Sequence, residues 1–221
     1  MNENSSQDYI ELNRKYAKFQ NSFLFSKPES IDAVLEKNGV VVVLGDKGSG
    51  KTTEIKQFQL NHRDNSVCFE LKDIYSGVKS VKSEIESLDL KNDDSCLYLL
   101  FDSIDECRLQ GTRQQDAFKT TLRKIKNDLE NQPIHISKLK FIFTSREADW
   151  KKDADNNLIK EYLTINTLKQ NSNTVILNDQ TNNTTDTEKH SLQINVYILK
   201  ELDDDQKRLI AKYFGKNEDF F

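Results

Sequence analysis

Residues 40–53 read VVVVLGDKGSGKTT, and this stretch decides the fold. Its first five residues form an uninterrupted apolar run, which is typical of a strand buried on both faces of a sheet. The second part satisfies G-x-x-x-x-G-K-[ST], the P-loop pattern, in which glycines permit turns with positive φ and successive backbone N–H groups point at phosphate oxygens. The stretch therefore predicts a phosphate-binding loop between a buried strand and a helix.

We expect this loop to bind the phosphate groups of a nucleotide. We expect Lys51 to reach the β- and γ-phosphates and the Thr52 hydroxyl to bind Mg²⁺, while the following helix adds the positive end of its dipole. The alternative is a plain surface turn, which the position of the loop between a strand and a helix disfavours. The predicted nucleotide-binding residues are Gly45, Asp46, Lys47, Gly48, Ser49, Gly50, Lys51, Thr52 and Thr53.

The rest of the chain predicts an α/β fold. Apolar runs predict further strands, and apolar residues at helical spacing predict helices between them. Strands that alternate with helices form a parallel sheet with helices on both faces, and the carboxyl ends of all the strands then lie along one edge. The expected strands are residues 40–44, 67–71, 96–101, 139–143 and 194–199, and the expected helices include residues 52–59, 78–88, 112–130 and 202–215.

The expected core extends from residue 39 to residue 221, after an N-terminal helical lead-in over residues 1–38. In the lead-in, Ser26-Lys27-Pro28-Glu29 has the spacing of a capping box and predicts a helix start. Residues 170–190 are rich in Asn, Thr, Asp and Gln, which predicts a polar insertion; a plain surface loop is the alternative. Because two phenylalanines end the sequence abruptly, we expect a fragment of a longer multidomain protein.

A second strand end is expected to carry acidic groups to the same edge. Asp102 follows the apolar run 96–101, in the position from which a Walker B carboxylate binds Mg²⁺ through water. Asp105 and Glu106 follow within one helical turn, and each is a candidate to orient or deprotonate the attacking water. A solvated acidic loop is the alternative interpretation. The predicted metal ligands are Thr52 and Asp102.

The strand expected at residues 139–143 delivers further polar groups to this edge. Thr144 is expected to touch the attacking water or the γ-phosphate, and Arg146 is expected to pair with phosphate oxygens through its planar guanidinium. For Arg146 the alternative is a structural ion pair with Asp102 or Glu106. The predicted catalytic residues are Asp105, Glu106, Arg146 and Thr144.

Composition disfavours several classes of protein. Acidic residues outnumber basic ones by 36 to 32, so the net charge of −4 gives no basic field, and direct nucleic-acid binding is not expected. No apolar run is long enough to span a bilayer, and the N-terminus lacks a signal-peptide pattern. Three cysteines without paired spacing indicate reduced thiols and a cytoplasmic location. The three histidines have no metal-ligand spacing.

Together, the three motifs resemble the STAND class of P-loop NTPases and, within it, the NACHT clade. The matching pieces are GDKGSGKTT, FDSIDE and TSRE, and the resemblance covers roughly residues 40–215. It implies a P-loop NTPase three-layer sandwich whose five parallel strands lie in the order 5-1-4-3-2, with ATP or ADP and Mg²⁺ as cofactors. Two positions depart from the family pattern, because Ser103 stands in place of a glycine and Glu147 in place of a proline.

The resemblance also implies a function. A NACHT-like protein rests with ADP bound, and it associates with itself in the ATP state after a trigger, an unknown ligand or protein, is detected; many bacterial members act in defence against phage. We therefore expect slow, regulatory ATP hydrolysis. The alternative is an AAA+-type motor or remodeller, in which Thr144 serves as the polar sensor. A GTPase is disfavoured because no N-K-x-D motif occurs, and an inactive scaffold is disfavoured by the intact Lys51, Thr52 and Asp102.

Overall fold

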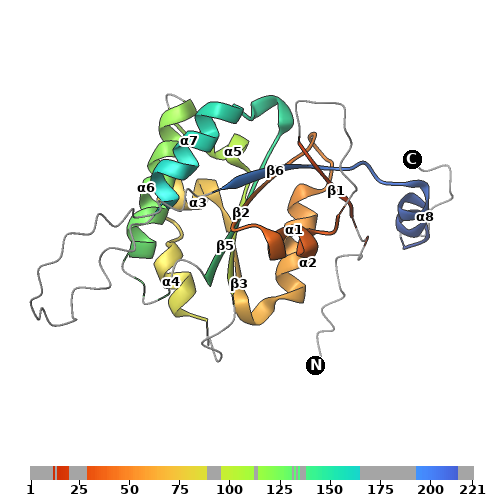
Figure 1. Cartoon of the computed structure of the whole chain (residues 1–221), viewed down its shortest axis with the longest axis horizontal. Coiled ribbons are helices and arrows are strands. Elements are labelled where there is room, and N and C mark those ends of the chain that lie inside the picture. Colours follow the sequence, from red (N-terminus) through yellow and green to blue (C-terminus); the bar gives the residue numbers. More distant parts are fainter. Residues whose placement is uncertain are drawn as a thin grey trace, which may run out of the picture.

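The structure of the chain is a computed structural model that describes residues 12, 14–19, 29–88, 96–111, 114–130, 132, 134, 138–164 and 193–213. It has a central β-sheet with helices on both faces (Figure 1). The polar insertion predicted at residues 170–190 and the terminal pair of phenylalanines lie outside the described residues.

In the described part of the chain the sheet has six strands in the order β1-β6-β2-β5-β4-β3. The strands from β2 to β6 run parallel to one another, as predicted, so their carboxyl ends share one edge. β1 pairs antiparallel with β6. The bounds are β1 (Tyr16–Lys18), β2 (Val40–Leu44), β3 (Ser66–Glu70), β4 (Leu97–Asp102), β5 (Leu139–Ser145) and β6 (Ile194–Leu199).

The predicted strand order is wrong for this sheet as a whole. The five-stranded order 5-1-4-3-2 has no place for β1, although the five predicted strands lie side by side as β6-β2-β5-β4-β3 within the larger sheet. β1 also replaces part of the predicted helical lead-in. Tyr16 and Ala17 are buried in it, because the edge of β6 offers unpaired backbone groups that a further strand satisfies.

The helix expected to start at residues 26–29 begins later, at Ile31. Glu29 exchanges two backbone hydrogen bonds with Tyr16, of 2.9 and 3.0 Å, and these keep Glu29 in an extended bridge. Ser30 then caps the helix, because its hydroxyl accepts from the Ala33 N–H at 3.3 Å. The segment before β2 is therefore part strand and part helix.

Figure 1 shows α1 and α2 on one face of the sheet and α3 to α7 on the other. Sequence periodicity missed α3 and α5, which are too short to show a repeat, and α7, whose buried face includes an aspartate. Among the described residues no helix is long and apolar enough to cross a membrane. The bounds are α1 (Ile31–Lys37), α2 (Lys51–Asn61), α3 (Leu71–Ser76), α4 (Val81–Glu86), α5 (Ile104–Arg108), α6 (Gln114–Glu130), α7 (Lys152–Leu163) and α8 (Asp204–Tyr213), with 3₁₀ turns at Arg63–Asn65 and Glu147–Asp149.

The apolar run of β2 is continuous because both of its faces are covered. Val40, Val42 and Leu44 belong to the hydrophobic cluster that lies under α3 to α7. Val41 and Val43 belong to the cluster under α1 and α2. Each of the five is at most 3% exposed. The prediction of a strand buried on both faces is confirmed, and this strand leads directly into the glycine-rich loop.

The last described helix, α8, begins with a capping box, and two of its large apolar side chains are exposed. The Asp203 N–H donates to Gln206 Oε1 at 3.0 Å and the Gln206 N–H donates to Asp203 Oδ1 at 2.9 Å, which is the reciprocal pair of a capping box. Leu209 and Tyr213 are 45% and 52% exposed. Gln206 and Ala211 are buried instead, because the helix turns the Gln206 side toward the N-terminal segment.

Candidate active site

Side chains from three elements meet where β4 and β5 end and α2 begins. Asp102 is the last residue of β4, Thr144 is near the end of β5, and Thr52 lies in the first turn of α2. The Thr52 hydroxyl donates to Asp102 Oδ2 at 2.7 Å, and the Thr144 hydroxyl donates to the other carboxylate oxygen, Oδ1. The structure therefore brings together three side chains that come from separate motifs of the sequence.

The turn after β4 holds Thr144 in this position. Ser103 has a φ of +64°, and its N–H donates to Thr144 Oγ1 at 2.8 Å. Glycine adopts this left-handed conformation most readily, which explains the glycine that the family pattern has at position 103. Thr144 is fully buried, and its hydroxyl accepts from Ser103 while it donates to Asp102. The structure thus places Thr144 as a support for the carboxylate.

Asp102 is a buried carboxylate, only 4% exposed, with which no Lys or Arg side chain of the described residues forms an ion pair. A carboxylate that only hydroxyl groups hold keeps much of its desolvation cost, and a cation that binds it relieves this cost. With Thr52 it presents hard oxygen atoms, the ligands that Mg²⁺ prefers. No three His, Cys, Asp or Glu side chains converge within the described ranges. A Mg²⁺ site here therefore needs water and phosphate oxygens as well, which is the usual arrangement for this ion.

The P-loop has the backbone that phosphate binding requires. Gly48 and Gly50 have φ values of +78° and +93°, which residues with a side chain rarely adopt. A Cβ atom on Gly45 would come within 2.7 Å of Ser49 Oγ. The Ser49 hydroxyl is buried and has no hydrogen-bond partner in the described part of the chain, so the loop contains an unsatisfied polar group. These features fit a bound phosphate group.

The ammonium of Lys51 lies over this loop. It donates to the carbonyl oxygens of Gly45 and Asp46, each at 2.8 Å. Burial lowers the pKa of Lys51, and the nearby carboxylates of Asp105 and Asp102 oppose this shift. Lys51 therefore lies close to the acidic side chains at the strand ends. The predicted loop residues that are exposed to solvent are Asp46, Lys47, Gly48, Thr52 and Thr53.

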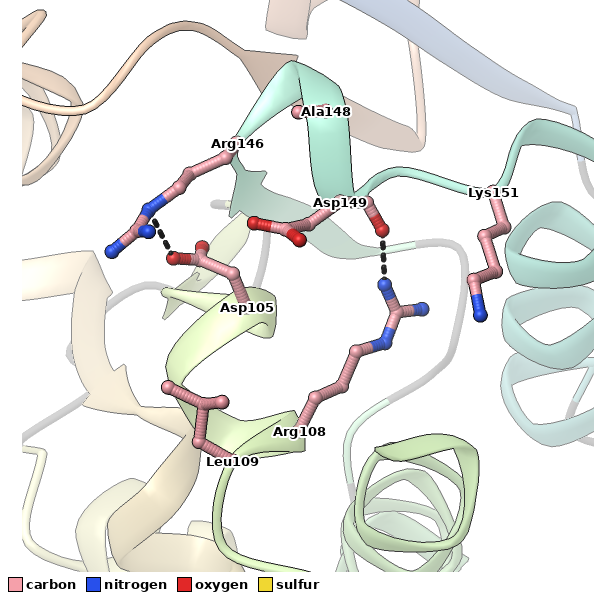
Figure 2. Close-up of a pocket in the computed structure, with 7 residues that line it drawn as sticks. All are labelled: Asp105, Arg108, Leu109, Arg146, Ala148, Asp149 and Lys151. Atoms are coloured by element: carbon pink, nitrogen blue, oxygen red, sulfur yellow. Dashed lines mark hydrogen bonds and ion pairs between the residues drawn. The ribbon is translucent and has the colours of Figure 1, made fainter. Parts of the chain in front are cut away.

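Asp105 and Arg146 form an ion pair beside Lys51. Asp105 is only 9% exposed, and its Oδ2 lies 2.8 Å from Arg146 Nε. Figure 2 shows the two side chains pointing toward one another. Both charges act on the pKa of Lys51, which places the pair within electrostatic reach of the P-loop. The partner of Arg146 is therefore Asp105, and neither Asp102 nor Glu106, the two partners considered from the sequence.

Glu106 is directed to a different part of the molecule. Its carboxylate lies 3.3 Å from Lys72 Nζ on α3, and the same ammonium lies 2.7 Å from the carboxylate of Glu70. The Glu106 side chain is 45% exposed. The structure thus separates the two candidate bases, because only Asp105 lies with Arg146 and Lys51.

Comparison with models of protein families matches residues 27–197 to Novel STAND NTPase 3, nSTAND3. The match covers most of the chain and includes all three motifs. The chain belongs to the nSTAND3 family. This makes it a STAND-class NTPase, so nucleotide hydrolysis of the signalling type is supported, as is the use of nucleotide and Mg²⁺ in general. Comparison with curated proteins gave no match.

A pocket of about 150 Å³ adjoins the Asp105–Arg146 pair of the nSTAND3 chain. It lies between α5 and the 3₁₀ turn Glu147–Asp149 (Figure 2). None of the described residues that line it belongs to the P-loop, and small-molecule sites are typically larger, roughly 300–1,000 Å³. We therefore assign the nucleotide to the open sheet edge and not to this pocket. The lining residues are Asp105, Arg108, Leu109, Arg146, Ala148, Asp149 and Lys151.

Sequence reasoning missed two buried arginines of the nSTAND3 chain. Arg14, 6% exposed, donates to the carbonyl oxygen of Ser49 inside the P-loop at 3.0 Å. Arg108 on α5 forms an ion pair with Asp155 on α7. No spacing signals the first contact, because Arg14 reaches the loop only through the pairing of β1 with β6. No spacing signals the second either, because Arg108 and Asp155 are 47 residues apart in the sequence.

Proposed function

We propose that this nSTAND3 chain binds ATP with Mg²⁺ and hydrolyses it slowly, as the regulatory switch of a NACHT-like signalling protein. The observation that carries the proposal is the carboxylate of Asp102, which is buried, lacks a cationic partner among the described residues and is oriented by the hydroxyls of Thr52 and Thr144. Such a group favours a bound cation, and it lies at the strand ends beside Lys51, where a phosphate supplies the remaining oxygens.

Nucleotide binding changes the partners of three side chains in this proposal. Lys51 exchanges the neutral carbonyl oxygens of Gly45 and Asp46 for charged phosphate oxygens, which are stronger acceptors. Thr52 and Asp102 hold Mg²⁺, which neutralises charge on the phosphate groups. The backbone N–H groups of the loop and the first turn of α2 complete the phosphate site.

Asp105 is the proposed base, and Glu106 is the alternative. Asp105 lies with Arg146 at 2.8 Å in the group that surrounds Lys51, whereas Glu106 pairs with Lys72. The ion pair with Arg146 orients the Asp105 carboxylate, and it also engages the carboxylate oxygen Oδ2. For Asp105 to take a proton from water, Arg146 has to turn toward another anion, and the phosphate is the obvious one. This extra rearrangement is the physical reason to expect slow turnover.

The wider role in the proposal comes from the NACHT resemblance. It includes self-association in the ATP state, a trigger ligand or protein, a cytoplasmic location and a setting in antiviral defence. The alternative is an AAA+-type motor or remodeller. Measuring mass in solution with ATP and with ADP distinguishes the two, because the switch is expected to associate only with ATP, whereas a motor forms hexamers that persist through turnover.

The test of the catalytic proposal is single-turnover ATP hydrolysis by the 221-residue chain with Mg²⁺. We expect a rate constant below about 1 s⁻¹, the low end of ordinary enzyme turnover. Lys51→Ala is expected to abolish both binding and hydrolysis. Fast turnover without any trigger would contradict the switch, and unchanged ATP binding by Lys51→Ala would contradict the phosphate site itself.

A further inference from the structure

Arg14 joins the P-loop to the segment that follows β6. Its side chain is buried, and Nη1 donates to the carbonyl oxygen of Ser49 at 3.0 Å while Nη2 donates to the carbonyl oxygen of Lys200 at 2.6 Å. Ser49 and Lys200 are 151 residues apart in the sequence. A planar guanidinium with two parallel donors suits this bridge, because it fixes two acceptors relative to one another.

The contact with Ser49 determines the direction of a phosphate-binding group. In a planar trans peptide the carbonyl C=O and the following N–H point in opposite directions. The Ser49 C=O points toward Arg14, so the Gly50 N–H points away from the guanidinium. Gly50 is the N-cap of α2, where backbone N–H groups bind phosphate. The guanidinium of Arg14 thus orients the Gly50 amide of the loop.

Gly50 has a second reason to lack a side chain. Its φ of +93° already favours glycine. In addition, a Cβ atom at this position would come within 3.1 Å of Arg14 Nη1. A side chain at position 50 would therefore crowd Arg14 as well as strain the backbone.

The segment that carries Arg14 is attached to α8. The amide Nε2 of Gln206, in the first turn of α8, donates to the carbonyl oxygen of Leu12 at 2.6 Å. Lys15 Nζ lies 3.2 Å from the carboxylate of Asp203, the cap of the same helix. The Lys200 N–H donates to the carbonyl oxygen of Lys15 at 2.9 Å. A displacement of α8 therefore acts on residues 12–15 and, through Arg14, on the loop.

We propose that Arg14 is a positioning residue that couples the P-loop to α8. The coupling rests on the proposed function in so far as the ligand of the loop is a nucleotide phosphate. Because coupling between two sites is reciprocal, a bound phosphate tightens the attachment of α8, and a partner that pulls on α8 weakens phosphate binding. Arg14 is thus the contact through which α8 responds to phosphate binding in the P-loop.

The first experiment measures amide hydrogen exchange of residues 45–53 and 204–213 in the 221-residue chain without nucleotide. Gln206→Glu keeps the acceptor for the Asp203 N–H and removes the donor to Leu12, so it disturbs the attachment of α8 while Arg14 itself is unchanged. We expect it to accelerate exchange in the P-loop, as Arg14→Gln does directly. Lys207→Gln removes an exposed ion pair with Asp204 inside α8, makes no change to the contacts with residues 12–15, and is the matched control, with an expected change of about twofold or less.

The second experiment measures ATP affinity by calorimetry, with exchange of α8 followed in parallel. Arg14→Gln and Arg14→Lys are expected to bind ATP about tenfold more weakly, the cost of one lost charged hydrogen bond. Lysine is included because it keeps the charge but cannot bridge two carbonyl groups. In the wild type, ATP is expected to slow exchange of residues 204–213, and in both Arg14 variants this response is expected to disappear.

Three results would overturn the coupling: normal P-loop exchange in Gln206→Glu, no response of α8 to ATP in a wild type that binds ATP, or an Arg14→Lys variant that behaves as wild type. Urea unfolding of each variant shows whether it is folded, and Gln206→Glu decides the question if the Arg14 variants are not. If the wild type fails to bind ATP, the proposed function fails, whereas the nucleotide-free exchange still tests the coupling.

Discussion

Two buried aspartates on either side of α5, Asp102 and Asp155, are held in opposite ways. Asp155 is fully buried on α7; it forms an ion pair with Arg108 and accepts from the Lys151 N–H at 2.6 Å. Asp102 is almost as buried, but its two described partners are threonine hydroxyls. Arg108 neutralises the first carboxylate, whereas no Lys or Arg side chain of the described residues forms an ion pair with the second.

The difference separates a structural site from a ligand site. A buried ion pair that is complete has no need of a further partner, and its role is to fix α5 against α7. A buried carboxylate with only neutral donors remains short of positive charge, and it lies where Thr52 and Lys51 converge. Burial alone therefore does not identify a functional acid; the charge of its partners does.

Removal of the Arg108–Asp155 ion pair is expected to lower the stability of the chain more than any other change considered. Asp155→Asn leaves the Arg108 guanidinium buried without its counter-charge, so we expect the free energy of unfolding to fall by about 3–5 kcal/mol. Urea unfolding measures it. The matched control is Glu130→Gln, which removes a surface pair with Lys126 and is expected to cost at most about 1 kcal/mol. Equal effects of the two variants would show that the Arg108–Asp155 pair has no structural role.

A second pair of variants compares the rates of ATP hydrolysis after substitution of the two neighbouring acids on α5. Asp105→Asn is expected to slow single-turnover ATP hydrolysis by about 100-fold or more, the contribution of a positioned general base. Glu106→Gln is expected to change the rate by about twofold or less, since it removes an exposed pair with Lys72. The reverse order of effects would make Glu106 the base and Asp105 a structural partner of Arg146.

A third carboxylate, that of Glu54, is expected to have the smallest effect, a change in stability with pH. Burial raises the pKa of Glu54, although the Tyr16 hydroxyl donates to it at 3.1 Å and opposes the shift. Because the folded pKa exceeds the unfolded one, Glu54 favours the folded state at low pH, and this contribution is lost as pH rises through the raised pKa. Glu54→Gln should therefore gain stability relative to the wild type between pH 4 and pH 7 in urea unfolding. A constant difference across this range would contradict the assignment.

The parallel core was predictable because its signals are local. Val40–Leu44 is apolar throughout, since both faces of β2 are covered, and topology then places Asp102 and Thr144 at the edge that carries the P-loop. β1 was not predictable in this way. Its three residues are too few to show a period of two, and what holds them is the free edge of β6, far away in sequence.

The sequence also could not predict which charged side chains pair with one another. Asp105 and Glu106 are neighbours, and spacing alone offers either one to the site. The direction of α5 separates them, turning Asp105 to Arg146 and Glu106 to Lys72. Arg14 belongs to no motif, and its contact with the P-loop depends on the pairing of two strands. Contacts of this kind arise from tertiary packing and have no local pattern.

The most direct measurement of the central claim is calorimetric titration of ATP into wild type and Asp102→Asn, with and without Mg²⁺. We predict that Mg²⁺ strengthens ATP binding by the wild type and has no such effect on Asp102→Asn. The variant should also be at least as stable as the wild type, because it loses a buried charge that forms no ion pair with any described residue. Mg²⁺-dependent binding that persists in Asp102→Asn, or an unfolding cost like that of Asp155→Asn, would contradict the assignment of Asp102 to the metal.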